Sequence, residues 1–211
     1  MQSIAVFFAF VLLTTGQAMA ADAASSETEI RPLLLGSRVP DAPVQTLDGK
    51  PSSLSAVVAG KPSVLVFYRG GWCPYCNLQL AQLQQIQGDL KDLGFRVVAI
   101  SPDPPAQLHQ TLEKHSLEYV LVSDNAAAAM KAFGVAYRVD QKTLQQYHGW
   151  NIDIANGVLP VPSVFIVDGD GAIQFSYAHP DYKIRVPGQV VLAAARAIAA
   201  REHRLHPQGE K

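Results

Sequence analysis

The chain alternates short apolar runs with longer segments in which apolar residues recur at helical spacing. The run at 63–68 is almost continuously apolar, a pattern typical of a buried central strand. After a cysteine-containing turn, apolar residues recur every three or four positions until Gly94, which predicts one helix that ends at this glycine. The apolar members of this series are Leu80, Leu83, Ile86, Leu90 and Leu93.

The remaining segments continue the alternation of strands and helices. The pattern predicts strands at 95–100, 119–122, 163–167 and 172–177, and helices around Leu108 and Leu112, at 126–133 and at 187–200. The Asp-Gly-Asp-Gly sequence at 168–171 is a strong hairpin signal between the last two strands. The polar segment 140–157 has no clear period and is interpreted as an insertion or irregular loop. This order predicts a three-layer α/β domain with a mixed sheet.

The two ends of the chain differ from this pattern. Residues 4–13 form an apolar run, and the small-x-small triplet at 18–20 follows it, as is typical of a secretory signal peptide over 1–20. The run is about half of the ~20 residues that a membrane-spanning helix needs, so we expect no permanent membrane anchor. We therefore expect export, with a periplasmic location, a flexible leader over 21–35 and a polar tail over 201–211.

Composition and charge narrow the class of protein. The 211 residues are 48% hydrophobic and 17% charged, which suffices for one sizeable core and excludes a disordered or fibrous chain. Lys and Arg (17) nearly balance Asp and Glu (18), giving a formal net charge of −1. Because such a chain has no strong electrostatic field, we expect no nucleic-acid partner.

The chemistry is predicted at Cys73 and Cys76, the two cysteines of the chain, in a Trp-Cys-Pro-Tyr-Cys motif where a strand gives way to a helix. In a first helical turn, unpaired N–H groups and the helix dipole stabilise a thiolate, which can bring its pKa to roughly 3.5–7.5. A purely structural disulfide across so short a loop would stabilise the fold little. A zinc site would need His203 and His206, which we interpret as solvated tail residues, so no metal is expected.

Further motifs occur in a fixed order along the chain: Gly36, Pro-Asp-Ala-Pro at 40–43, Leu-Asp-Gly at 47–49, the segment 67–76, Leu-Pro-Val-Pro-Ser at 159–163 and Asp-Tyr-Lys-Ile-Arg at 181–185. In this order the chain resembles the peroxiredoxin-like branch of the alkyl hydroperoxide reductase and thiol-specific antioxidant family over residues 36–200. The resemblance implies a thioredoxin-like fold with an N-terminal extension. It also implies that Pro162 is a cis-proline that faces the cysteines.

The chain departs from the peroxiredoxins of this superfamily at several positions. They carry Phe-Tyr-Pro-x-x-x-Thr-x-x-Cys, and aligned on the Phe-Tyr pair this pattern places Arg69 at the proline. It also places Cys73 at the threonine and Cys76 at the peroxidatic cysteine. The peroxide-activating arginine falls on Pro162, whereas Arg185 matches a second arginine of that family or is an ordinary surface charge. These departures favour disulfide exchange over peroxide reduction.

We therefore expect an exported thiol–disulfide oxidoreductase in which Cys73 attacks and Cys76 resolves the mixed disulfide. The docking groove is expected at Trp72, Tyr75, Val161 and Pro162, and thiolate stabilisation at Arg69 and Arg185. No bound cofactor is expected, because electrons would arrive through a dithiol partner protein. The alternatives are a thiol peroxidase that acts on a small peroxide with Cys76, and a redox-inert binding protein.

Overall fold

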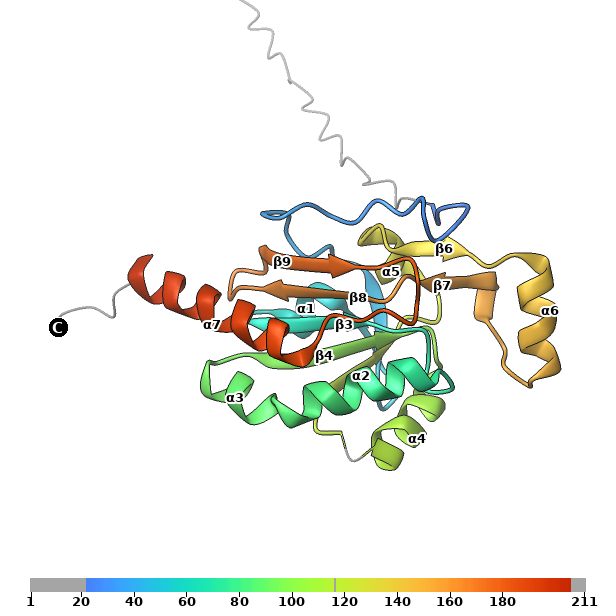
Figure 1. Cartoon of the computed structure of the whole chain (residues 1–211), viewed down its shortest axis with the longest axis horizontal. Coiled ribbons are helices and arrows are strands. Elements are labelled where there is room, and N and C mark those ends of the chain that lie inside the picture. The colour runs from blue at the N-terminus through green and yellow to red at the C-terminus, as the bar shows by residue number, and fades with distance from the viewer. Residues whose placement is uncertain (1–21, 116, 206–211) are drawn as a thin grey trace, which may run out of the picture.

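The computed structural model describes residues 22–115 and 117–205 (Figure 1). The signal peptide predicted over 1–20 lies outside the described residues, as do residues 206–211 of the predicted tail. Among the residues that are described, no helix combines the length and the apolarity needed to cross a membrane.

Within the described residues, seven strands form a central sheet in the order β2-β1-β5-β4-β3-β8-β9. β4 pairs in parallel with β3 and with β5, and the other neighbours are antiparallel. The strands are β1 (Pro43–Thr46), β2 (Pro51–Ser53), β3 (Ser63–Phe67), β4 (Arg96–Ser101), β5 (Val120–Ser123), β8 (Ser163–Val167) and β9 (Ile173–Ala178). The mixed sheet and the hairpin between β8 and β9 confirm the sequence prediction.

Alternation along the strands builds a hydrophobic core on each face of the sheet. In β3, Val64 and Val66 belong to one buried cluster, whereas Leu65 and Phe67 belong to the other. Residues of α2 (Pro74–Gln85), α3 (Gln87–Asp92), α4 (Pro105–His115) and α7 (Gly188–Leu205) complete the first cluster, and those of α1 (Leu54–Val58) and α5 (Ala128–Ala132) complete the second. The domain therefore has three layers, as predicted.

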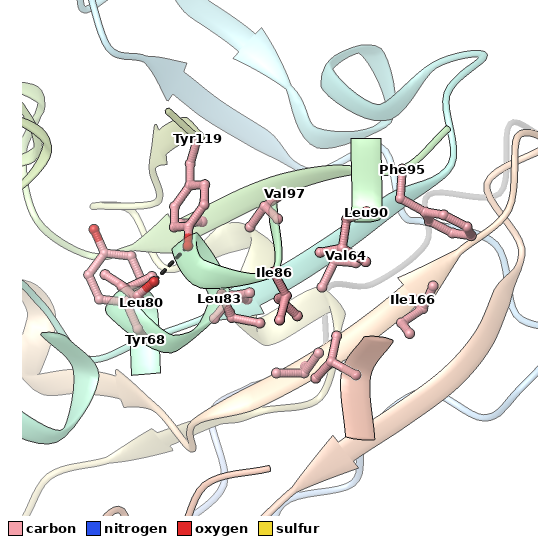
Figure 2. Packing of buried hydrophobic residues seen from close by; sticks show 14 of the residues in the cluster. Val64, Tyr68, Leu80, Leu83, Ile86, Leu90, Phe95, Val97, Tyr119 and Ile166 are labelled. Carbon is pink, nitrogen blue, oxygen red and sulfur yellow. Dashed lines mark hydrogen bonds between the residues drawn. The ribbon is translucent and has the colours of Figure 1, made fainter. Parts of the chain in front are cut away.

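The helix predicted to end at Gly94 is divided into α2 and α3 at Ile86, whose φ of −104° and ψ of 5° interrupt the helical backbone. Leu80, Leu83, Ile86 and Leu90 nevertheless all pack in the same cluster (Figure 2). The apolar spacing therefore predicted the buried face correctly, although it did not reveal the break. Gly94 ends α3 with a φ of +84°, a conformation that glycine adopts without strain.

The segment 140–157, interpreted from sequence as an irregular loop, contains α6 (Gln141–Gly149) and the short 3-10 helix Ala155–Gly157. The Asp140 side chain accepts a hydrogen bond from Thr143 N at 3.0 Å and so caps the start of α6. In α6 one residue, Tyr147, is buried, so the helix shows little apolar periodicity in the sequence. The interpretation as a loop is wrong for this helix.

A two-stranded sheet of β6 (Ala136–Arg138) and β7 (Val158–Pro160) lies beside α6 at one end of the molecule (Figure 1). The strap, residues 22–35, runs along this sheet and the end of α5. Ala24 N donates to Ala136 O at 2.9 Å, and Arg31 N donates to Gly134 O at 3.0 Å. A flexible leader was expected at this position. The strap instead forms main-chain hydrogen bonds to residues 133–136. At the other end, α7 extends to Leu205 and includes the first residues of the predicted tail.

Candidate active site

The two cysteines lie where β3 leads into α2, as the motif predicted. Cys73 is the N-cap of α2 and Pro74 is the first helical residue, where its missing N–H leaves no bond unmade. The Cys73 carbonyl oxygen accepts bonds from Cys76 N at 3.0 Å and from Asn77 N at 3.1 Å. Both sulfurs therefore sit in the first turn of α2, at the positive end of the helix dipole.

The thiols of Cys73 and Cys76 are free and buried, with exposed fractions of 1% and 0%. The pKa of Cys73 is lowered to about 6, chiefly by the Cys76 thiol beside its sulfur, and also by the Cys76 N–H and the charges of Arg69 and Arg185; burial opposes this shift. Burial raises the pKa of Cys76 well above its usual range, and the neighbouring Cys73 raises it further. At neutral pH the pair therefore carries one negative charge, which lies mainly on Cys73.

Arg185, from the segment between β9 and α7, contacts the deeper sulfur. Its Nη2 atom lies 3.4 Å from Cys76 Sγ. Its Nη1 atom donates to Gln79 Oε1 at 2.7 Å, and its Nε atom donates to Tyr182 O at 2.7 Å. These bonds fix the orientation of the guanidinium toward Cys76. Arg185 is therefore not an ordinary surface charge, which was the other interpretation of this residue.

Arg69 is buried, with an exposed fraction of 3%, and lies among aromatic rings. Its guanidinium carbon is 4.2 Å from the ring centroid of Tyr182, 5.2 Å from that of Trp72 and 5.6 Å from that of Tyr147. It also donates a hydrogen bond to the Tyr147 hydroxyl. Tyr147 comes from α6, so the sequence interpretation missed this partner; the Asp140 cap is the signal that could have revealed its helix.

The predicted docking groove is only partly present. Trp72 is half-buried and packs on Tyr147, with ring centroids 5.2 Å apart. Tyr75 is 40% exposed and contacts Tyr182 edge-on, with centroids 5.7 Å apart. Tyr75 is therefore the more accessible of these two aromatic residues beside the cysteines.

Val161 and Pro162 do not have the predicted arrangement. The described residues contain no cis peptide bond, so the expectation of a cis-proline at Pro162 is wrong. Val161 N donates to Val135 O at 2.8 Å, and Val161 O accepts from Ser163 Oγ at 2.7 Å. The backbone here joins β7 to β8 as a buried internal segment. Val161 therefore has no free polar group with which to pair with a substrate strand.

Sequence reasoning also missed a buried acid beside the motif. Asp103 follows β4, is 6% exposed, and accepts a hydrogen bond from Gly71 N at 2.7 Å through Oδ2. Burial raises the pKa of its carboxyl group. Asp103 borders a cleft of about 260 Å³ between α4 and the segment after α6, with Trp72 on its wall. The signal that could have revealed Asp103 is its position directly after β4, the strand that pairs with β3.

No group of three or more metal-ligating side chains occurs within 22–115 and 117–205.

Comparison with known proteins gives a consistent result. The model of the AhpC/TSA family matches residues 35–176. A putative peroxiredoxin Bcp from Haemophilus influenzae is 34% identical over 106 residues, which are 50% of this chain and 68% of that protein. Peroxiredoxin Bcp from Escherichia coli is 28% identical over 163 residues, covering 77% of this chain and 96% of the relative. Chloroplastic peroxiredoxin Q relatives from rice are matched over 58% of their length.

Solved structures confirm the fold. The structure of peroxiredoxin Q from Xanthomonas campestris aligns with a TM-score of 0.61 at 22% identity, covering 79% of this chain and 97% of that one. Reduced Prx3 from Vibrio vulnificus, solved in complex with hydrogen peroxide, aligns with a TM-score of 0.66 at 19% identity over 77% of this chain and 99% of that one. These matches confirm the thioredoxin-like fold that the resemblance implied.

The names of the relatives overturn the expected thiol–disulfide oxidoreductase, because they are peroxiredoxins. The expectation rested on the loss of two peroxide-activating groups, the threonine at the position of Cys73 and the arginine at the position of Pro162. Arg185, which the sequence analysis named as a thiolate-stabilising residue, reaches the Cys76 sulfur, so the loss of an arginine at Pro162 does not leave this sulfur without a cation.

Proposed function

This chain belongs to the AhpC/TSA family, and from this premise we propose that it is a thiol peroxidase in which Cys76 attacks the hydroperoxide and Cys73 resolves the product. The observation that carries the proposal is the Arg185 guanidinium, held 3.4 Å from Cys76 Sγ by its bonds to Gln79 and Tyr182. A fixed cation beside the sulfur also lies beside the oxygens on which negative charge develops during attack. Donors that are oriented in advance in this way commonly supply the largest share of a rate enhancement.

The second cysteine supplies the base that the attack requires. The resting negative charge lies mainly on Cys73, next to the Cys76 thiol. A thiol is activated as a nucleophile when an adjacent base accepts its proton. Transfer of this proton to Cys73 leaves a Cys76 thiolate that faces Arg185. The Cys73 thiolate therefore serves as the general base, and no separate base is needed.

The reaction then balances within the pair. The Cys76 thiolate attacks the terminal, hydroxyl-bearing oxygen of the hydroperoxide, and the O–O bond breaks. The leaving alkoxide takes the proton from Cys73 and becomes an alcohol. Cys76 is now a sulfenic acid and Cys73 is again a thiolate. Cys73 attacks the Cys76 sulfur and hydroxide leaves, forming the Cys73–Cys76 disulfide. A dithiol partner protein returns the two electrons by thiol–disulfide exchange, so the cycle uses no bound cofactor.

Stopped-flow measurement of single-turnover peroxide consumption by the reduced protein tests this assignment. Cys76→Ser should lower the rate with hydrogen peroxide and with an alkyl hydroperoxide by at least 100-fold. Cys73→Ser, which lacks the proposed base, should still consume one equivalent of peroxide, roughly 100-fold more slowly, and should accumulate a sulfenic acid at Cys76 that dimedone labels. If Cys76→Ser keeps the wild-type rate while Cys73→Ser loses it, the roles of the cysteines are reversed. If neither change lowers the rate, the protein is not a thiol peroxidase.

Arg185 provides a second test of the same site. Arg185→Met removes the charge and should slow peroxide attack by roughly 100-fold, whereas Arg185→Lys should retain part of the rate. Arg138→Met is a matched control, because Arg138 pairs with Asp22 at the surface. Equal rates in Arg185→Met and Arg138→Met would contradict the proposed role of Arg185.

We also propose that the protein acts after export to the periplasm. The support is the apolar run at 4–13 and the small-x-small triplet at 18–20, both outside the described residues. N-terminal sequencing of protein from its native host should begin at Ala21. An intact Met1 on cytoplasmic material would contradict this proposal.

A further inference from the structure

Gly71, two residues before Cys73, is bound to side chains through both of its main-chain polar groups. Its N–H group donates to Asp103 Oδ2 at 2.7 Å, and its carbonyl oxygen accepts from Asn77 Nδ2 at 2.8 Å. Neither bond takes part in the proposed reaction. Together they fix the orientation of the peptide planes on the two sides of Gly71.

The two side chains that bind Gly71 are themselves anchored. Asp103 is buried just after β4, and its N–H group donates to Ser101 Oγ at 3.1 Å. Asn77 lies in α2, where its N–H group donates to the Cys73 carbonyl oxygen at 3.1 Å. Its buried Oδ1 atom has no hydrogen-bond partner among the described residues, so the bond to Gly71 orients this amide. Gly71 is therefore tied both to the central sheet and to the helix of the cysteines.

Gly71 also packs tightly against α4. A Cβ atom added to Gly71 would lie 2.0 Å from Thr111 Oγ1 and 3.3 Å from Thr111 Cβ. Thr111 is buried, and its hydroxyl donates to the Gln107 carbonyl oxygen at 3.1 Å. The main chain at Gly71 therefore approaches α4 closely only because this residue has no side chain.

The position of Gly71 determines the position of Cys73. Cys73 N donates to the Gly70 carbonyl oxygen at 3.1 Å, which closes a four-residue turn over 70–73. Cys73 is the N-cap of α2, with a φ of −88° and a ψ of 115°, and its N–H group lies outside the helical hydrogen-bond pattern. The helix therefore holds the carbonyl side of Cys73, whereas the turn around Gly71 holds its amide side.

We propose that Asp103 and Asn77 are positioning residues that clamp Gly71 from both sides and thereby hold Cys73 beside Cys76. They act through the Gly71 main chain and not on the peroxide. The inference rests on the proposed function, in which Cys73 accepts the proton of Cys76 and later attacks the Cys76 sulfur. Both steps need the two sulfurs in contact, and a misplacement of about 1 Å can cost roughly 100-fold in rate.

Hydrogen exchange of the reduced, full-length protein measures the clamp without peroxide. Asn77→Ala removes the donor to Gly71 without changing the charge, and alanine suits a helix. The amides of Gly71 and Cys73 should exchange at least tenfold faster, while those of β3 should exchange as in the wild type. Asp103→Ala should have the same effect, so the conclusion does not depend on one variant folding. Unchanged exchange at Cys73 in both variants, or equally faster exchange in β3, would overturn the inference.

Single-turnover peroxide consumption shows whether the clamp acts through Cys73. With both cysteines present, Asn77→Ala and Asp103→Ala should each slow consumption about tenfold. In the Cys73→Ser protein the same changes should alter the rate less than twofold, because the sulfur that the clamp positions is absent. Equal slowing in the two backgrounds would overturn the inference, since the effect would then lie on Cys76 or on the whole fold.

Two controls separate the hydrogen bond from charge and from stability. Asp103→Asn keeps an oxygen that can accept from Gly71 and should retain the rate within threefold; a rate as low as in Asp103→Ala would overturn the inference. Asp124→Ala removes the buried acid after the neighbouring strand β5, which accepts from Ala129 N and Met130 N, and should leave the rate within twofold. Equal slowing in Asp124→Ala and Asp103→Ala would also overturn it.

The clamp and the peroxidase activity can fail separately. Hydrogen exchange would still decide whether Asn77 and Asp103 hold Cys73 in a protein that consumed no peroxide. An unchanged exchange rate at Cys73 would leave the peroxidase proposal standing, because that proposal depends on the two cysteines and Arg185.

Discussion

Cys73 and Cys76 are three residues apart in one helix, yet their environments shift their thiol pKa values in opposite directions. Cys73 lies at the N-cap, where the Cys76 thiol and N–H and two guanidinium groups favour its thiolate. Cys76 is deeper, and both burial and the adjacent Cys73 disfavour its ionisation. The pair thus holds one proton and one charge, which is the state that proton transfer between the two sulfurs requires.

The absorbance of the reduced protein at 240 nm should therefore rise by one thiolate with a midpoint near pH 6, and the second thiol should not ionise below pH 9. Because the folded pKa of Cys73 lies below the usual value of 9.0, the stability of the reduced protein should rise between pH 6 and pH 9. In Cys76→Ala the midpoint should move upward, because the side-chain donor that chiefly lowers the Cys73 pKa is removed. Two thiolates titrating together near pH 6 would contradict this description.

Asp124 offers a second test at the residue scale, away from the cysteines. It is buried, accepts hydrogen bonds from Ala129 N at 2.9 Å and Met130 N at 2.8 Å, and burial raises its pKa to about 6 from 3.8. The folded state therefore binds a proton that the unfolded state releases between these pH values. Proton binding by Asp124 therefore contributes about 3 kcal/mol to the free energy of unfolding at low pH, and this contribution should be lost as pH rises from 4 through 6.

Urea unfolding of the wild type and of Asp124→Asn from pH 4 to pH 7 measures this contribution. The difference in unfolding free energy between the two proteins should change across this range and level off above it. A constant difference would show that Asp124 has an ordinary carboxyl pKa.

At the scale of elements, α6 is the helix that connects the site to the rest of the molecule. Its buried residue, Tyr147, belongs to a small cluster with Val139, Ile154 and Leu159, and also contacts Arg69. The helix has nine residues, a length at which packing and capping rather than intrinsic propensity determine stability. The order of α6 therefore depends on a few contacts.

Asp140→Ala removes the side chain that caps α6 at Thr143 N. Hydrogen exchange of the α6 amides should become about tenfold faster, while the amides of β3 and β4 should exchange as in the wild type. Ser53→Ala, which removes the N-cap of α1, is a matched control on another helix and should leave α6 unaffected. Faster exchange throughout the sheet would instead indicate a global loss of stability.

At the scale of the whole molecule, the strap closes one end of the domain. At Gly134 the φ angle is +68°, and a Cβ atom added there would lie 1.9 Å from the Arg31 carbonyl oxygen. The strap can therefore approach Gly134 only because Gly134 has no side chain. Arg138 and Asp22 add a surface ion pair with a distance of 2.9 Å.

Gly134→Ala should displace the strap and lower the unfolding free energy by about 2 kcal/mol, with new proteolytic cleavage within 22–35. Gly60→Ala is the matched control, because Gly60 has a φ of +66° but nothing within 4 Å of its added Cβ atom. Gly60→Ala introduces only the strain of the left-handed backbone conformation, so the strap should stay protected from proteolysis. Equal protease sensitivity in the two variants would mean that the strap does not depend on Gly134.

The sequence determined the features that depend on neighbours along the chain. The alternation of Val64, Leu65, Val66 and Phe67 specified a strand buried on both faces, and the spacing of cysteines and proline specified a thiol pair at a helix start. The same ordered motifs identified the family. These features follow from local periodicity and from the chemistry of a first helical turn, which act within a few residues.

The sequence named Arg185 as a thiolate-stabilising residue, but only the tertiary structure decided which sulfur it contacts and which other distant groups surround the site. Arg185 is 109 residues from Cys76, and Tyr147 is 78 residues from Arg69, yet each pair is in contact. The sequence argument treated the missing arginine at Pro162 as a missing function, because a pattern at one position cannot show that another segment supplies the same charge. It missed the strap and the trans bond at Pro162 for a related reason: main-chain pairing between remote segments depends on packing, which leaves little trace in local composition.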